Sequence, residues 1–166
     1  GVSIKGESRV KIINFLGRVP DYEIYYYFIE VSKIFLKRNG IKSYIIPNTF
    51  LFNVFASDYR LKLLNSWDIN IVDCTAFKIF EGATVYNAIT IFQNSLNQDF
   101  VKYKITKNAN NFSELINNKY EFITKSNIIK NNQNWCLAFK LENKVLNLVI
   151  QIKEKSKKLI EFFPEI

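Results

Sequence analysis

The residues of clearest chemical interest in this sequence are Pro47 and Asn48, which end an apolar, β-branched run at 41–48. A second apolar segment, 49–66, follows without a spacer. Ligands of open α/β sheets bind beyond the carboxyl ends of the strands, so a strand that ends where a helix begins is a candidate binding edge. The simpler interpretation is local. Proline has no N–H to donate to a neighbouring strand inside a sheet, and Asn48 or Thr49 caps the next helix.

Two absences exclude whole classes of chemistry. The sequence has no histidine, and Cys74 and Cys136 are its only cysteines, so neither a transition-metal site nor a histidine-based triad is credible. Two distant cysteines in a cytosolic protein favour free thiols over a disulfide. No apolar run approaches the roughly 18 residues that cross a bilayer, and there is no signal peptide, so we expect a soluble, cytoplasmic protein with no membrane partner.

The formal net charge of +8 and the pI of about 9.4 favour a polyanionic partner such as nucleic acid. A composition rich in Lys, Asn and Ile could raise the pI by itself. The candidate phosphate contacts are cationic residues of helical segments: Arg60, Lys62, Lys153, Lys155, Lys157 and Lys158. Solvated surface charge is the competing interpretation for all of them. Tyr25–Tyr27 invite base stacking, but successive helical residues point in different directions, which favours packing. Asp73 is given no role.

The elements that must position these residues alternate between helices and strands. Apolar residues at helical spacing predict helices at 22–39, started by Asp21 and ended at Gly40, and at 49–66. Short apolar runs predict strands at 41–48, 69–77 and 83–94. The brief link KIFEG between the last two predicts an antiparallel hairpin. Scarce glycine and proline argue against an all-β sandwich, so we expect the α/β class.

The pattern of residues in the sequence changes beyond residue 96. The sequence predicts a strand at 99–107, a short helix at 110–119 and a mixed stretch at 120–139. An amphipathic helix then covers 143–163 and ends at Pro164. Its apolar stripe consists of Val145, Leu148, Val149, Ile152, Leu159, Ile160 and Phe163.

Three segments carry a family resemblance: DYEIYYYFIEVSKIFLKRNG at 21–40, SYIIPNTFLFNVFASDYRLKLL at 43–64 and DCTAFKIFEGATVYNAITIF at 73–92. In this order and spacing they resemble the N6-adenine DNA methyltransferases of restriction–modification systems. The closest class is the gamma class, which includes type IIG restriction enzymes. The segments resemble, in turn, the helix after that family's catalytic loop, the next strand and helix, and the terminal hairpin. They cover roughly residues 21–95.

The resemblance implies part of a Rossmann-like sheet of an S-adenosylmethionine-dependent methyltransferase, ending in an antiparallel hairpin and followed by a helical C-terminal extension. Residues 1–19 show no steady period, so 1–20 is expected to be a lead-in or linker. The resemblance implies the C-terminal half of a methyltransferase-like α/β domain at 21–96. The rest, 97–166, would be a mixed extension that leads toward a target-recognition region.

In the family that this chain resembles, an adenine leaves the duplex and its N6 receives a methyl group from S-adenosylmethionine. The resemblance implies that Phe80, in KIFEG, stacks on this base and that Tyr44 lies beside the same pocket. Core packing is the competing interpretation for both residues. The glycine loop that holds the cofactor and the Asn-Pro-Pro-Tyr catalytic loop are absent from this sequence and are expected upstream of Gly1. We therefore expect no catalytic or cofactor-binding residue here, and no activity of the chain alone.

The resemblance implies double-stranded DNA as the partner. A sheet with an exposed first-strand edge also tends to pair with itself, so a homodimer is expected. Two alternatives stay open. A non-catalytic DNA-binding or target-recognition module would explain the charge, and a structural domain would carry that charge through composition alone.

Overall fold

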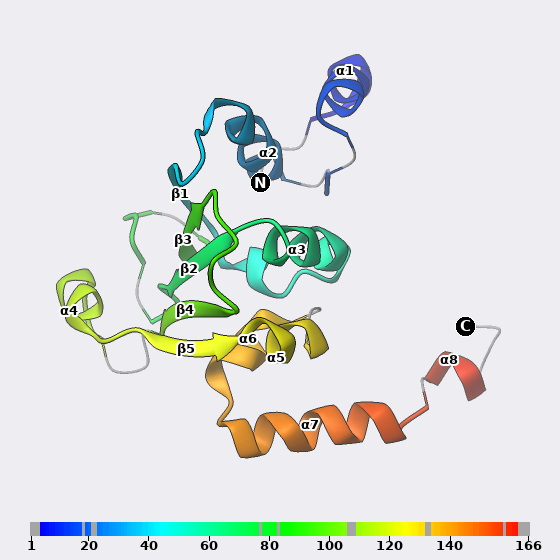
Figure 1. Cartoon of the computed structure of the whole chain (residues 1–166), viewed down its shortest axis with the longest axis vertical. Helices are drawn as coiled ribbons and strands as arrows, with labels where there is room; N and C mark the ends of the chain where they lie inside the picture. The colour runs from blue at the N-terminus through cyan, green and yellow to red at the C-terminus, as the bar shows by residue number, and fades with distance from the viewer. Residues whose placement is uncertain are drawn as a thin grey trace.

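The computed structural model describes residues 4–17, 19–20, 23–76, 78–82, 84–105, 109–131, 134–157 and 159–162. It confirms the α/β class (Figure 1). The elements are α1 (Gly6–Leu16), α2 (Tyr25–Phe35), β1 (Ile41–Pro47), two 3₁₀ turns η1 (Asn48–Leu51) and η2 (Val54–Ala56), α3 (Ser57–Leu64), β2 (Asp68–Asp73), β3 (Asn87–Gln93), β4 (Phe100–Ile105), α4 (Phe112–Asn117), β5 (Glu121–Thr124), α5 (Lys125–Lys130), α6 (Trp135–Lys140), α7 (Asn143–Lys155) and α8 (Leu159–Phe162).

One mixed sheet, in the order β1-β3-β2-β4-β5, organises the described chain. The predicted hairpin is confirmed, because β2 and β3 pair antiparallel. β3 also pairs antiparallel with β1, which makes β1 and β2 parallel to each other, and β4 runs parallel to β2. The sheet therefore continues past residue 96, and Asp68 at the start of β2 accepts hydrogen bonds from the N–H groups of Asn97 and Gln98 (3.0 and 3.1 Å). The three-part division of the chain stays a prediction.

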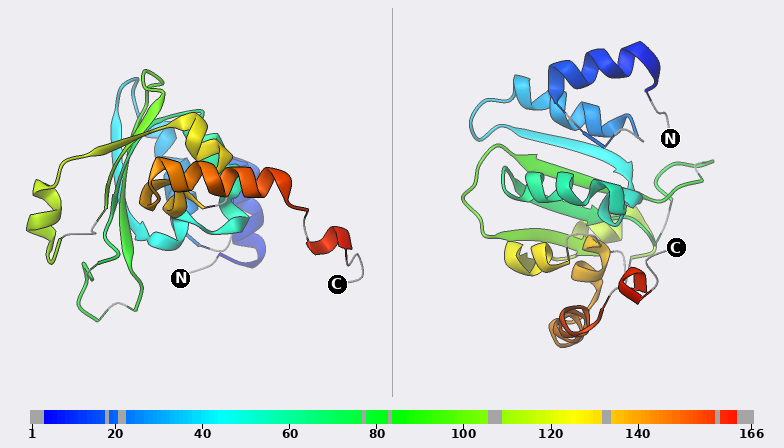
Figure 2. Two further views of the ribbon diagram at one scale, coloured as in Figure 1. Left: turned by 90° about the horizontal axis from the view of Figure 1, so that it is seen from below. Right: turned by 90° about the vertical axis from the view of Figure 1, so that its right-hand side faces the viewer.

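Helices cover one face of the sheet. α2, α3, α5 and α6 lie on the same side, and α4 lies on the other (Figure 2). The buried residues of β1 point toward this helical layer, since the Lys42 ammonium and the Tyr44 hydroxyl both reach carbonyl oxygens of α2. Alternation along the strand turns Ile41 and Ile45 to the opposite face, where they are exposed.

Aromatic residues fill the core between the sheet and this layer. Phe50 is the centre of the group, with edge contacts to the rings of Tyr25 (6.3 Å between ring centres) and Trp135 (5.9 Å). Phe139 of α6 stacks on Tyr103 of β4 at 4.8 Å. These contacts join the N-terminal helices to elements near residue 140, so the described chain has one principal core.

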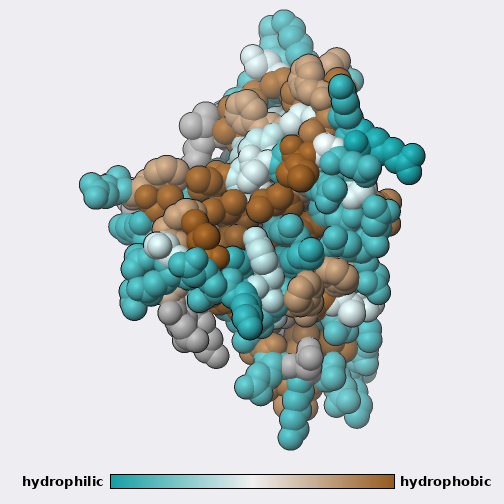
Figure 3. Space-filling model, turned by 60° about the vertical axis from the view of Figure 1, so that its left-hand side comes forward, coloured by the Kyte–Doolittle hydropathy of each residue, from teal (hydrophilic) through white to brown (hydrophobic). Residues whose placement is uncertain are grey.

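The opposite face of the sheet is only partly covered. α4 and its flanking chain pack Ala109 and Leu115 against Val72 and Cys74. The Lys104 ammonium ties α4 to the sheet by donating to the Ile116 carbonyl oxygen. The remaining face shows a hydrophobic band (Figure 3). The exposed apolar side chains of the two edge strands β1 and β5 are Ile41, Ile45 and Phe122.

Several helices differ from the sequence prediction. Residues 6–16 form α1 instead of an irregular lead-in, although α1 buries no side chain. α2 is shorter than 22–39: it ends at Phe35, and Asn39 turns the chain with a left-handed φ of 61°. The predicted cap Asp21 lies outside the described residues. Phe28 and Phe35, two apolar residues of the predicted helix 22–39, are exposed, whereas the tyrosines at 25–27 are buried.

The C-terminal amphipathic helix is also different. It is divided into α7 and α8, and the predicted Phe163 and Pro164 lie outside the described residues. Leu146 and Ile150 are the side chains of α7 that pack on the core. The stripe expected to be buried is exposed at Val145, Leu148 and Ile152. The sequence correctly indicated an amphipathic helix, but the side chains that pack on the core lie beside the predicted stripe rather than on it.

Lys42 is a buried charge under α2. Its ammonium donates to the Ile29 carbonyl oxygen (2.6 Å) and lies 4.0 Å from the centre of the Trp67 ring. Burial lowers the pKa of this ammonium to about 8, whereas lysine in an unfolded chain titrates near 10.4. Between these two values the unfolded chain binds more protons than the folded chain, so the free energy of unfolding rises with pH.

We expect the wild-type chain to gain stability relative to the Lys42→Met variant as pH rises from about 8 to about 10. Urea unfolding of both proteins across this range measures the difference. The comparison cancels the titration of buried tyrosines and cysteines, which both proteins share. A stability difference that is constant over this range would contradict the expected burial of the charge.

Candidate functional site

The candidate site is the edge of the sheet where the parallel strands end. β1, β2 and β4 run in the same direction, so Pro47, Asp73 and Ile105 end at one edge, and Asn87 begins β3 beside them. The connection 74–86 leaves from this edge. Open α/β sheets bind ligands there, which agrees with the position inferred from the strand end.

Pro47 and Asn48 are held as a strand end. Pro47 faces Asn87 across the ladder, and the Asn48 N–H donates to the Tyr86 carbonyl oxygen (2.9 Å). The expected capping role of Asn48 or Thr49 is wrong: neither side chain caps η1. Instead Asn53 accepts a hydrogen bond from the Phe55 N–H (3.0 Å), because the 3₁₀ turns delay the start of the α-helix.

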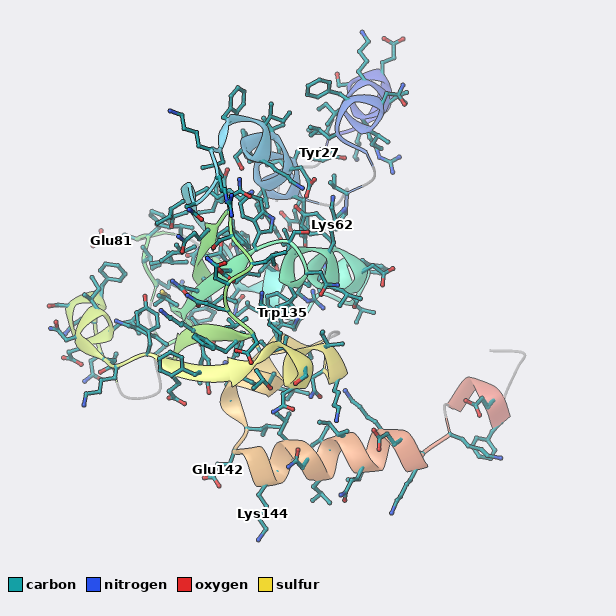
Figure 4. All side chains as sticks on the ribbon, in the orientation of Figure 1. Tyr27, Lys62, Glu81, Trp135, Glu142 and Lys144 are labelled. Atoms are coloured by element: carbon teal, nitrogen blue, oxygen red, sulfur yellow. The ribbon has the colours of Figure 1, made fainter. Side chains whose placement is uncertain are left out.

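Phe80 lies in the connection 74–86 and is 49% exposed. Val85 and Tyr86 of the same connection are also exposed, so the loop offers apolar and aromatic surface at the sheet edge. Gly82 has a φ of 77°, a conformation that favours glycine and turns the chain back toward β3. Glu81, next to Phe80, lies at the margin of the molecule (Figure 4). A ring in this position is free to contact a ligand.

Tyr44 lies in the middle of β1, three residues before the strand end. Its hydroxyl donates to the Phe28 carbonyl oxygen of α2 (3.0 Å), and its ring packs against the principal core. The hydrogen bond directs Tyr44 toward the helical layer, whereas Phe80 lies on the loop beyond β2. The structure therefore places the two predicted pocket residues on different elements, and their shared role stays a prediction.

Arg60 is a structural residue, although the sequence suggested a solvated charge or a phosphate contact. Its side chain is fully buried, and Nη1 donates to the carbonyl oxygens of Phe50 (3.1 Å) and Asn53 (2.7 Å). It thereby holds the two 3₁₀ turns on α3. Lys62 is exposed and pairs with Glu30 (2.9 Å), an interaction that contributes up to about 1 kcal/mol.

Tyr25, Tyr26 and Tyr27 are all buried, so none of them presents a ring to a base. Burial raises the pKa of the Tyr25 and Tyr26 hydroxyls. The sequence correctly favoured packing over base stacking for these tyrosines.

Asp73 and Lys140 form a pair that the sequence did not reveal. Asp73, at the end of β2, accepts a hydrogen bond from the Thr75 N–H (3.1 Å), and its Oδ2 lies 3.2 Å from the Lys140 ammonium.

Burial raises the pKa of Cys74 to about 12 and that of the nearby Cys136 to about 11, so both free thiols are protonated at neutral pH. They are poor nucleophiles and poor metal ligands.

The described residues contain neither a cluster of His, Cys, Asp and Glu side chains suited to a metal ion nor a helix long and apolar enough to cross a membrane.

Comparison with known proteins agrees with this architecture. A family model described as Eco57I restriction-modification methylase matches residues 12–80. The match includes α2, β1, α3, β2 and Phe80, and it confirms the resemblance to restriction–modification methylases over this part of the chain. No curated protein matches the sequence.

A solved structure, "cryoEM structure DrdV-DNA complex", shares the fold with a TM-score of 0.51 and 15% sequence identity. The similarity covers 69% of this chain and 13% of that chain. Because this chain spans only a small part of its structural neighbour, the activity, substrates and partners of the whole protein are matters for proposal.

Proposed function

We propose that this chain is part of an adenine-specific (N6) DNA methyltransferase of a restriction–modification system, in which the Phe80 ring stacks on an adenine extruded from the duplex. The observation that carries the proposal is the half-exposed ring of Phe80 on a loop rooted at the carboxyl edge of the sheet. The match to a restriction-modification methylase over residues 12–80 supports it.

The chemistry explains why such a ring is needed. An exocyclic amine inside a duplex is inaccessible, so the base must leave the stack before it is methylated. An aromatic side chain that stacks on the extruded base contributes about 1–3 kcal/mol. In this proposal Phe80 stabilises the extruded base, and Tyr44 of β1 lies beside the same pocket.

The methyl donor of the intact enzyme is S-adenosylmethionine, but the described residues at this edge do not fit it. Asp73, whose carboxylate could bind ribose hydroxyls, is 1% exposed and already engaged by Thr75 and Lys140. Asn87 is also buried. We therefore assign cofactor binding and methyl transfer to residues outside this chain and derive no step through the cofactor.

It follows that the 166-residue chain is inactive by itself. Incubation with duplex DNA and radiolabelled S-adenosylmethionine should give no methylated adenine, and calorimetry should detect no cofactor binding. Turnover by the isolated chain would overturn this part of the proposal.

Double-stranded DNA is the proposed partner, and the cytoplasm is the proposed location. The net charge of +8 supports the first of these. Binding of a duplex that carries an unpaired adenine tests the proposal most directly, with fluorescence anisotropy at several salt concentrations. We expect tighter binding than to the fully paired duplex, with affinity falling as salt rises. Equal affinity for both duplexes would contradict a base-binding role.

The charge also favours a second candidate, a non-catalytic DNA-binding or target-recognition module. Exposed lysines of α7, such as Lys153 and Lys155, would supply phosphate contacts. Such a module would bind paired and unpaired duplexes equally. The division into a methyltransferase-like part at 21–96 and an extension at 97–166 belongs to the first proposal.

We also propose that two copies pair through β1, an edge strand of the described sheet. Asn48 donates toward β3, so the alternate residues Ile41, Ser43 and Ile45 direct their backbone groups toward the free edge. Exposed apolar side chains at Ile41 and Ile45 add to this surface. Light scattering coupled to gel filtration distinguishes a dimer from a monomer, and the Ile45→Lys variant should be monomeric.

A further inference from the structure

Among the described residues, the hydrogen bonds that hold the root of the Phe80 loop include the following three. The Cys74 N–H donates to the Asn87 carbonyl oxygen (3.0 Å), and the Asn48 N–H donates to the Tyr86 carbonyl oxygen (2.9 Å). The third bond is different, because the Thr75 N–H donates to a side chain, the Asp73 carboxylate (3.1 Å). The direction in which the chain leaves β2 therefore depends on the Asp73 carboxylate.

The Asp73 carboxylate depends in turn on Lys140. Asp73 is buried at the end of β2, and its second oxygen lies 3.2 Å from the Lys140 ammonium. The same ammonium donates to the Thr75 hydroxyl at 3.5 Å. A buried carboxylate is costly without a countercharge, so Lys140 keeps Asp73 in the position that binds the Thr75 N–H.

Lys140 is held in place by the helix that carries it. It is the last residue of α6, whose Trp135 and Phe139 are buried in the principal core. Trp135 packs on Phe50, and Phe139 stacks on Tyr103. Figure 4 shows Trp135 between α6 and the layer of α3. Because these contacts hold α6 in place, the backbone of Lys140 stays within reach of Asp73.

We propose that Lys140 is a positioning residue for the Phe80 loop, acting through Asp73 and Thr75. The inference rests on the proposed function, in which Phe80 stacks on an extruded base. It gives α6, which lies outside the matched residues 12–80, a part in base binding. Movement of α6 therefore changes the root of the base-stacking loop, and the region after residue 96 is coupled to the pocket.

Amide exchange measured by NMR tests the positioning directly. In the Lys140→Met variant we expect about tenfold faster exchange at Thr75, because its hydrogen-bond acceptor loses its charged partner. Ile69 and Ile71, in the middle of β2, should exchange at the wild-type rate. Lys140→Arg should restore protection, since it keeps the positive charge, and Lys144→Met on the exposed start of α7 is the matched control.

Two results of this experiment would overturn the inference. One is unchanged exchange at Thr75 in Lys140→Met. The other is equal acceleration at Thr75, Ile69 and Ile71, which would show that Lys140 only stabilises the fold as a whole.

A DNA experiment connects the position of the loop to base binding. The probe is a duplex with 2-aminopurine at an unpaired position, whose fluorescence falls when an aromatic ring stacks on it. We expect Lys140→Met to weaken the quenching at saturating protein while the affinity for a fully paired duplex stays at the wild-type value. Loss of affinity for the fully paired duplex with normal quenching would identify Lys140 as a phosphate contact and overturn the inference. If the wild-type chain itself gives no quenching, the proposed function fails, and the exchange experiment still decides the positioning role.

Discussion

Replacing Trp135 by alanine will destabilise the folded chain by about 3–5 kcal/mol, the range for large aromatic side chains truncated in a core. Trp135 is fully buried, and its ring contacts both Phe50 and Phe139. The Arg60 guanidinium also lies 5.8 Å from the ring centre. Phe50 and Arg60 belong to the matched segment 12–80, and Trp135 does not. The substitution should therefore destabilise both the matched segment and the chain that follows it.

Urea unfolding, followed by circular dichroism, measures this effect. The urea concentration at the unfolding midpoint should fall, while the slope of the free energy of unfolding against urea concentration stays constant. The matched variant Trp135→Phe keeps most of the ring and removes an indole N–H that has no hydrogen-bond partner among the described residues, so its cost should be much smaller. Phe35→Ala, at an exposed position of α2, should change stability little. Two separate transitions in the wild-type chain, or a loss below about 1 kcal/mol in Trp135→Ala, would contradict a single core.

The Phe80→Ala variant should bind a duplex with an unpaired adenine about 5- to 150-fold more weakly, which corresponds to the loss of about 1–3 kcal/mol of stacking. Its affinity for a fully paired duplex should be nearly unchanged, because phosphate contacts do not involve Phe80. Since the ring is about half exposed, the stability of the fold should also change little.

Fluorescence anisotropy with both duplexes provides the measurement for Phe80. Val85→Ala is the matched control, because Val85 is an exposed apolar residue of the same connection. Phe80→Trp should keep the preference for the unpaired adenine, since indole also stacks on bases. If Phe80→Ala and Val85→Ala reduce binding equally, the loop contributes general apolar contact rather than a stacking ring.

One of these two predictions concerns a feature that the sequence indicated, and the other concerns a feature that it did not. The Phe80 loop could be found from sequence, because KIFEG and the following strand resemble a family pattern. The Trp135 contacts could not, since residues 120–139 showed no clear period. In the structure this stretch forms one short strand and two short helices, each too short to display a period.

The sequence by itself determined the α/β class, the strands at β1, β2 and β3, and the strand end at Pro47. Local physical chemistry is sufficient for these features, because β-branched runs favour strands and proline ends them. The resemblance to restriction–modification methylases was also available from sequence order. Both the antiparallel pairing of β2 with β3 and the family match agree with it.

Only the tertiary structure decided which polar residues are structural. Arg60 is buried because the carbonyl groups of two 3₁₀ turns converge on it, and no local pattern reports that convergence. Lys140 meets Thr75 across 65 residues of sequence, beside the carboxylate of Asp73. Such pairs form where packing brings helix and strand ends together, and that information lies in the fold as a whole. Pro47 and Asn48 thus mark the edge of the site, while α6 determines how its loop is held.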